Sequence, residues 1–362
     1  MIKQHQSEDA GPPWFFWVVL CLLGALPRAF DLIYSTSLQN RDFGIFYAAG
    51  RLAWSNGAAV YDPGALAAYT RNLYGFDLHV PFPYPPHALF LVAPFGALPF
   101  AFAFALWTLI GLGLFTWAAR PHLGRAPRWL PLVLPATLVC VTYGQTGLFI
   151  GALWLLAFSG RPWALAALTI KPHIGALAAL NDRRAILPAL LIGVGIVAAS
   201  VLVFGVEAWT RWFDVILHQA KTASTFQDTK FAPPSVAYGL VGQIAFAAAA
   251  IFLLSRKFNV FTAATATLLI SPYSYHYDMT VACLGFAVAL AEDRPPYQVA
   301  ICTLAFLTPA LMVFGSWVAA PLLLAGLWVQ AMGMTRRKLQ RPLAGQVGFD
   351  QQDIGISQSG AI

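Results

Sequence analysis

Apolar runs follow one another along almost the whole chain, and short polar stretches separate them. Runs of this kind with few internal charges are typical of membrane helices. They predict about twelve helices, several of them shorter than the roughly 20 residues that a straight span needs. The expected helices cover residues 14–34, 99–118, 129–142, 147–158, 163–171, 173–181, 185–205, 236–254, 258–270, 278–291, 296–313 and 316–334. The short ones are interpreted as half-helices, or as helices extended by their flanking motifs, beside a cavity.

The first polar stretch, residues 35–85, is also the longest. Inside it, apolar side chains recur at helical spacing over residues 43–50 and again over residues 66–73. This spacing predicts amphipathic helices that lie on the membrane surface. Residues 87–98 are expected to form an interfacial or re-entrant segment, and residues 206–235 a second loop.

The composition restricts the class of protein. With 362 residues, a mean hydropathy of +0.66 and 10% charged residues, the chain is too apolar for a soluble fold. The net charge of +7 is scattered between the apolar runs, so nucleic acid is not an expected partner. The four cysteines lack the spacing of metal ligands, and neither a metal nor another cofactor is expected. We expect an all-α polytopic helix bundle over residues 1–340 and a disordered cytoplasmic tail over residues 341–362.

The basic residues of the short connections indicate how the chain crosses the membrane. Lys and Arg collect in the cytoplasmic loops of membrane proteins. Here they fall on alternate connections: Lys3, Arg120, Arg125, Arg128, Arg161, Arg183, Arg184, Arg256, Lys257, Arg294, Arg336, Arg337 and Lys338. The pattern predicts about 10–12 transmembrane helices in the plasma (inner) membrane. The long first loop and the polar motifs are then extracytoplasmic.

Five polar motifs interrupt the apolar chain and are predicted to emerge on that same side. They cover residues 41–43, 84–86, 143–147, 171–173 and 271–278. A polar cluster at one membrane face is how a multi-helix enzyme or transporter builds a site. No Walker loop, dinucleotide fingerprint or zinc pattern accompanies them. Chemistry on a soluble nucleotide is therefore unsupported.

Asp42 precedes a helical run in the first of these motifs. A carboxylate at the edge of a membrane cavity can accept a proton from an incoming hydroxyl, which is the work of a general base. An Asp in this position can equally cap the helix by accepting hydrogen bonds from its free backbone N–H groups. The residue alone leaves both interpretations open.

Lys171 comes directly before Pro172, and this pair predicts a helix break. Proline disfavours helix at the preceding residue and suits the first position of a new helix. The ammonium of Lys171 and the N-terminus of the new helix would then form a site for an anion. The alternative is a lysine that extends to the interface beside a chance proline. Burial of Lys171 would decide between the two.

Two motifs combine aromatic and polar side chains. Gln145 lies in a tight turn and can donate to and accept from a sugar hydroxyl, although a plain turn explains it equally well. In the last motif a proline breaks the helix before Tyr273, His276 and Asp278. Aromatic residues at an interface are often only a belt, but a belt needs neither the imidazole nor the carboxylate. Tyr84 is expected at a rigid corner, where it could stack on a sugar.

Taken in order, these motifs resemble glycosyltransferase family 87, the polyprenyl-phosphate-mannose-dependent mannosyltransferases of the GT-C superfamily. The resemblance covers roughly residues 30–290. It rests on the motifs occurring together in this order. The matching positions are Asp42, Phe46, Tyr47, Ala49, Gly57, Tyr61, Asp62, Tyr84, Pro85, Pro86, Gly144, Gln145, Lys171, Pro172, Ser271, Pro272, Tyr273, Tyr277 and Asp278.

The resemblance implies a GT-C helix bundle and a metal-independent, inverting transfer of a sugar, mannose, from a polyprenyl-phosphate donor to a lipid or glycan acceptor. Asp42 would be the catalytic base. Lys171, His276 and Tyr273 would bind the donor phosphate. Gln145, Tyr84, Tyr47 and Asp278 would bind the sugar or the acceptor.

Two other classes of protein remain possible from the sequence. A transporter or lipid flippase would also line a cavity with polar groups, but it would need access from the cytoplasmic face, where mostly loop arginines are found. The other class is a non-catalytic membrane subunit, which would not explain why a lysine lies between two apolar helices.

Overall fold

The computed structural model describes residues 12–34, 42–76, 78, 81–222 and 234–333, with side chains except at residues 30–34 and 219–222. Within these residues the regular secondary structure is helical and contains no strand, which confirms the all-α class. The predicted tail and Arg41 lie outside the described residues. The α-helices are α1 Trp14–Tyr34, α2 Asp42–Ala53, α3 Pro63–Tyr74, α4 Leu89–Gly96, α5 Phe100–Ala119, α6 Pro135–Tyr143, α7 Gly147–Phe158, α8 Pro162–Ala167, α9 Pro172–Gly175, α10 Ile186–Phe204, α11 Val206–Thr222, α12 Gly239–Arg256, α13 Val260–Ile270, α14 Thr280–Leu290, α15 Pro296–Phe306, α16 Thr308–Leu311 and α17 Ala319–Met332.

Prolines account for several of the helix starts. The first residue of α3, α6, α8, α9 and α15 is a proline, which lacks the N–H that would in any case be unpaired there. The predicted helices at residues 163–171 and 173–181 consequently become short α-helices, α8 and α9, followed by the 3₁₀ turns Leu168–Ile170 and Ala176–Leu180.

The breaks also change the number of full-length membrane spans. In the described part of the chain, three helical segments are long and apolar enough to cross a membrane: Phe100–His122, Arg183–Phe204 and Val236–Arg256. A fourth results if α15 and the segment Thr308–Phe314, bent by 55° at their junction, count as one. This is fewer than the 10–12 spans predicted from sequence, because the remaining apolar helices are short. The chain is nevertheless a helical membrane protein in its composition and architecture.

The first loop contains the two predicted helices, but one of them lies elsewhere than expected. α3 is amphipathic and buries only Leu66 and Thr70. α2, in contrast, is buried along its length except at Asp42 and Arg51. Its glycine at position 50 faces the backbone of α4, where a β-carbon would collide with Val92. The prediction that α2 lies on the surface is therefore wrong, because α2 is packed against α4 as part of the core.

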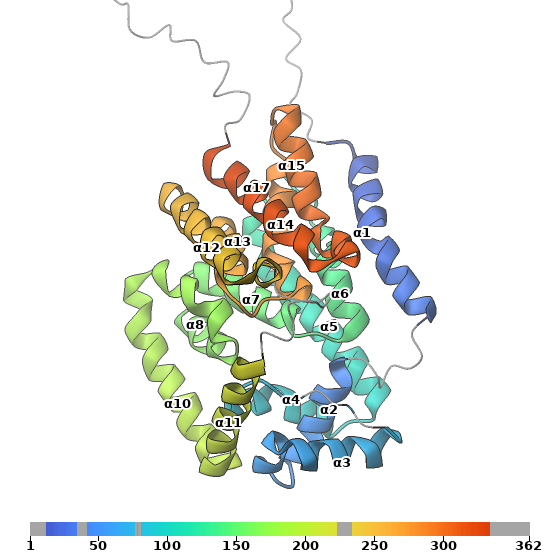
Figure 1. Ribbon diagram of the computed structural model, residues 1–362, viewed down its shortest axis with the longest axis vertical. Helices are drawn as coiled ribbons and strands as arrows, with labels where there is room; N and C mark the ends of the chain where they lie inside the picture. The colour runs from blue at the N-terminus through green and yellow to red at the C-terminus, as the bar shows by residue number, and fades with distance from the viewer. Residues whose placement is uncertain (1–11, 35–41, 77, 79–80, 223–233, 334–362) are drawn as a thin grey trace, which may run out of the picture.

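The segment after α10 was predicted as a loop and contains a helix instead. α11 follows α10 across a single residue, Gly205, whose φ of 84° turns the chain sharply. Its charged side chains lower the mean hydropathy of the segment to that of a loop, although its apolar residues recur at helical spacing. Figure 1 shows α11 beside α10, at the same end of the molecule as α2, α3 and α4.

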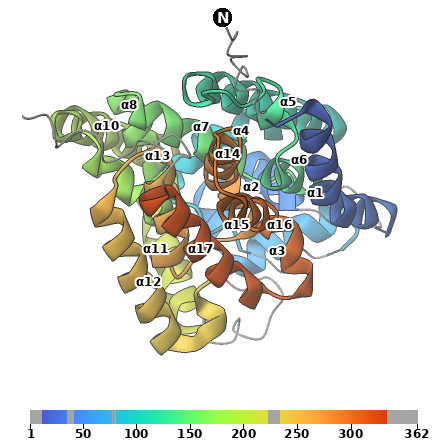
Figure 2. The ribbon, with the colours of Figure 1, turned by 90° about the horizontal axis from the view of Figure 1, so that it is seen from above.

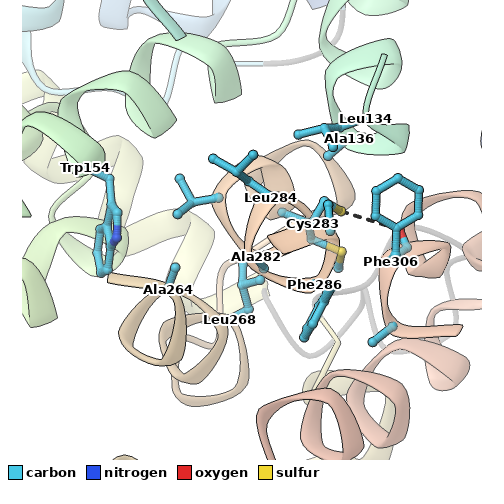
Figure 3. Packing of buried hydrophobic residues seen from close by; sticks show 14 of the residues in the cluster. Leu134, Ala136, Trp154, Ala264, Leu268, Ala282, Cys283, Leu284, Phe286 and Phe306 are labelled. Atoms are coloured by element: carbon cyan, nitrogen blue, oxygen red, sulfur yellow. Dashed lines mark hydrogen bonds between the residues drawn. The ribbon is translucent and has the colours of Figure 1, made fainter. Parts of the chain in front are cut away.

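The buried side chains form two hydrophobic clusters. The smaller one joins α2, α3 and α4 to α5, α7, α10 and α11 around Trp107, whose ring contacts those of Phe43, Phe95 and Phe149. The larger one fills the space among α6, α7, α13, α14, α15 and α17. Figure 2 shows α14 and α15 surrounded by other helices. Figure 3 shows this packing around α14, where Cys283 Sγ donates to the Phe306 carbonyl oxygen at 3.6 Å.

Candidate active site

The turn between α6 and α7 packs against the start of α2. α6 ends at Tyr143, and Gly144 caps it in the left-handed region with a φ of 68°. A β-carbon at Gly144 would lie 2.5 Å from Cβ of Phe43, closer than real contacts allow. Glycine is therefore required there, both for its φ and for its size. The turn brings Gln145 and Thr146 beside the first turn of α2.

Gln145 connects this turn to Asp42, the first residue of α2. The side-chain amide of Gln145 donates a hydrogen bond to the Asp42 carboxyl. Although Asp42 is solvent-accessible, the protein packed around it raises its pKa, and the hydrogen bond opposes that rise by stabilising the ionised form. Gln145 is buried, and its Oε1 has no hydrogen-bond partner among the described residues. Asp42 can thus accept a proton, and Gln145 can accept a hydrogen bond from a bound molecule.

Tyr84 reaches the same turn from the segment that precedes α4. Its hydroxyl shares a hydrogen bond of 2.8 Å with that of Thr146, and both side chains are buried. Its ring lies against those of Phe46 and Phe82, with centroids 5.7 and 5.4 Å away. Its backbone oxygen accepts from the Tyr61 hydroxyl at 3.0 Å. These contacts hold Tyr84 in one position beside the turn.

Lys171 and Asp278 form a buried ion pair. Lys171 lies at the break before Pro172, and its Nζ donates to Oδ1 of Asp278 at 2.5 Å. Only 5% of the lysine side chain and 0% of the aspartate side chain are exposed. Oδ2 of Asp278 accepts from the backbone N–H of Tyr275 at 3.1 Å, and the lysine Nζ lies 4.6 Å from the centre of the Tyr277 ring. Because Lys171 is buried, it is not a lysine extended to the interface.

The start of α7 joins these two parts. A β-carbon at Gly147 would overlap the backbone oxygen of Tyr277, so the two backbones touch. The Thr280 hydroxyl also donates to the Gly147 carbonyl oxygen at 3.2 Å. The turn that carries Gln145 is therefore fixed directly against the segment that carries Asp278.

Seven residues from five segments accordingly form one site, which we name the polar cluster: Asp42, Tyr84, Gln145, Thr146, Lys171, Tyr277 and Asp278. Burial raises the pKa of the Tyr84 hydroxyl and that of the Tyr277 hydroxyl, and the negative charges of Asp42 and Asp278 both contribute to the rise. The cluster holds a carboxylate that can accept a proton and a buried ammonium that can stabilise an anion. Among the described residues no group of three or more His, Cys, Asp or Glu side chains is arranged to hold a metal ion.

A comparison with known protein families gives this site its context. The family model of glycosyltransferase family 87 matches residues 82–313, more than half of the chain. The chain belongs to glycosyltransferase family 87. No curated protein and no solved structure matches it. The protein is therefore a membrane glycosyltransferase, and a sugar donor and an acceptor are its substrates. Asp42 lies before the matched range, and the other six residues of the polar cluster lie inside it.

Three residues expected at the site of this glycosyltransferase lie at its edge or away from it. The Tyr47 hydroxyl donates to the Leu98 carbonyl oxygen at 2.8 Å, so its hydrogen is already used in a bond within the protein. Tyr273 packs against Tyr275 at the edge of the polar cluster. His276 is buried, and its ring contacts the Tyr277 ring with centroids 5.6 Å apart.

The positive charge beside Pro172 comes from Lys171 rather than from a helix end. The predicted helix start at Pro172 is confirmed, but α9 has only four residues before it tightens into a 3₁₀ turn. A helix macrodipole needs several aligned peptide units. The positive charge available at this place is therefore that of the Lys171 ammonium.

Two features of the site were not anticipated from the sequence. Thr146 was part of a recognised motif, but nothing in the motif indicated that it bonds Tyr84. Arg28 was not assigned to the site, and its Nη1 donates to the Tyr143 hydroxyl at 3.4 Å, at the end of α6.

Proposed function

We propose that this glycosyltransferase moves a hexose, mannose, from a polyprenyl-phosphate donor to a hydroxyl of a lipid or glycan acceptor, at the extracytoplasmic face of the plasma (inner) membrane. The proposal includes a GT-C helix bundle and a single inverting displacement without a metal ion. The observation that supports it most is the convergence of Asp42 and Lys171, 129 positions apart in the sequence, on one polar cluster. A base and a buried cation are the two groups that this reaction needs.

In the proposed step, the acceptor oxygen attacks the anomeric carbon and its proton passes to the carboxylate of Asp42. The bond between that carbon and the phosphate oxygen breaks, and the electron pair leaves with polyprenyl phosphate. The donor phosphate is a diester with one negative charge, and the product monoester gains a second negative charge at its titratable oxygen. Stabilising this added charge is the task of a nearby cation.

Lys171 can supply that charge while it remains paired with Asp278. An ammonium has three N–H bonds, and Asp278 accepts one of them, which leaves the others for phosphate oxygens. The carboxylate also compensates for the cost of burying the ammonium in the absence of a donor. We therefore assign Asp278 to the positioning of Lys171, in place of the sugar-binding role suggested by the family resemblance.

The class of donor can be tested with purified protein. We expect transfer from a radiolabelled polyprenyl-phosphate sugar and none from the matching nucleotide sugar, because the sequence has no nucleotide-binding motif. The measurement is the labelled product formed in vesicles that contain an acceptor lipid extract and no endogenous polyprenyl phosphate. Turnover with the nucleotide sugar alone would contradict the donor assignment.

The hydrogen bond between Gln145 and Asp42 predicts a change in pH dependence. Replacing Gln145 with Leu removes a donor that favours the ionised carboxylate, so the pKa of Asp42 should rise further. A base works only when ionised, so the acidic limb of kcat/KM should move to higher pH. Measuring kcat/KM against pH for Gln145→Leu and for the wild type tests this. A loss of rate that is the same at every pH would assign Gln145 to substrate contacts alone.

A further inference from the structure

α11 carries an apolar stripe that no described part of the protein covers. Phe213 and Leu217 follow Val206 by seven and eleven positions, which is close to two and three helical turns. The three side chains therefore lie on one face of the helix. More than half of each side chain is exposed. We name these three residues the α11 stripe. An exposed stripe of this kind on an amphipathic helix needs an apolar surface to contact.

The α11 stripe is distinct from the face that packs on the protein. Ala208 and Val215 are buried on that other face, and the indole N–H of Trp212 donates to the Pro83 carbonyl oxygen at 3.1 Å. A third, polar face carries Arg211, whose guanidinium pairs with Glu207 at 2.7 Å. α11 therefore has a protein face, a water face and an apolar face.

The apolar face adjoins the exposed surface of α10. Trp209 lies on the α11 side next to the stripe, and its indole N–H donates to Ser200 Oγ of α10 at 3.1 Å. α10 belongs to one of the candidate membrane spans, and Leu202 and Val203 near its end are more than half exposed. The stripe thus adjoins the exposed apolar surface of a candidate span. Figure 1 shows α11 alongside α10.

We propose that α11 is an interfacial helix and that Val206, Phe213 and Leu217 insert into the lipid surface beside the end of α10. A helix with one charged face and one apolar face is suited to the boundary between headgroups and acyl chains. The occupant of the stripe is the bilayer itself rather than a second copy of the chain, because the stripe adjoins the exposed apolar surface of a candidate span. This assignment goes beyond sugar transfer and does not depend on the identity of the donor.

The same helix holds part of the polar cluster in place. Trp209 stacks on the His87 ring at 5.8 Å, and Trp212 bonds to Pro83. These two contacts fall on either side of Tyr84, which bonds to Thr146 in the polar cluster. The proposed lipid contact is therefore made by the element that fixes the Tyr84 segment.

Fluorescence quenching in vesicles can test the lipid contact. The full chain with Cys21→Ser as background would carry an environment-sensitive dye at Phe213→Cys or, as a matched control on the polar face, at His218→Cys. The other three cysteines are buried. We expect a nitroxide near the lipid headgroup to quench the dye at position 213 about twofold or more above the dye at 218, with aqueous iodide giving the reverse order.

Three results would overturn the proposal. Equal access of iodide to both dyes would show that the stripe faces water. A dye at position 213 shielded from both nitroxide lipid and iodide would show that protein covers the stripe. Stronger quenching by a nitroxide deep in the acyl chains than by one near the headgroup would show that α11 enters the bilayer core.

Discussion

Asp42→Asn is expected to lower the rate of sugar transfer by about a hundredfold to ten-thousandfold, the usual contribution of a general base. The amide keeps the shape of the side chain, and it can still accept a hydrogen bond from Gln145, but it cannot take the proton from the acceptor hydroxyl. Stability should change little, because Asp42 is solvent-accessible and the amide occupies the same space as the carboxyl. Transfer rate and thermal unfolding of the variant in detergent are the measurements.

Asp62→Asn is the matched control for this experiment. Asp62 is also a carboxylate of the first loop, but it caps α3 by accepting from Ala65 N–H at 3.0 Å and pairs with Arg211 at 3.1 Å. Its replacement should leave the transfer rate close to that of the wild type. A near-normal rate for Asp42→Asn, or an equal loss in both variants, would remove Asp42 from the role of base.

Lys171→Met is expected to abolish detectable donor binding and also to destabilise the fold by about 3 to 5 kcal/mol, the usual cost of breaking a buried ion pair. The loss of stability follows because the Asp278 carboxylate would remain buried without its cation. The double variant Lys171→Met with Asp278→Asn removes both charges and should recover most of the stability. Donor affinity should not recover, since the phosphate still lacks its cation.

The comparison of the single and the double variant separates two roles of Lys171. Calorimetric unfolding gives the stability, and titration with a polyprenyl-phosphate sugar gives the affinity. Lys257→Met is a suitable control, since Lys257 donates to the Gln330 carbonyl oxygen outside the polar cluster. If the double variant bound donor as the wild type does, Lys171 would be a structural residue only.

Most local conformations and the family could be predicted from the sequence. Its apolar runs predicted the class of fold and most helix positions, and its prolines predicted breaks such as the one at Lys171. The order of short motifs was enough to indicate glycosyltransferase family 87, which the family match confirms. These features depend on neighbours in the chain, because helix propensity, capping and proline geometry act over a few residues.

Which motif residues meet could be seen only in the folded protein. Lys171 and Asp278 are 107 positions apart, and nothing local to either residue indicates that the two pair. The burial of α2 was likewise not predictable, since the spacing of apolar residues does not show how many faces of a helix other helices will cover. In α11 the spacing of the residues separates charged from apolar faces, but only the packing shows which side chains contact the protein and which stay exposed. Such contacts depend on how distant helices pack together, and a local sequence pattern does not contain that information.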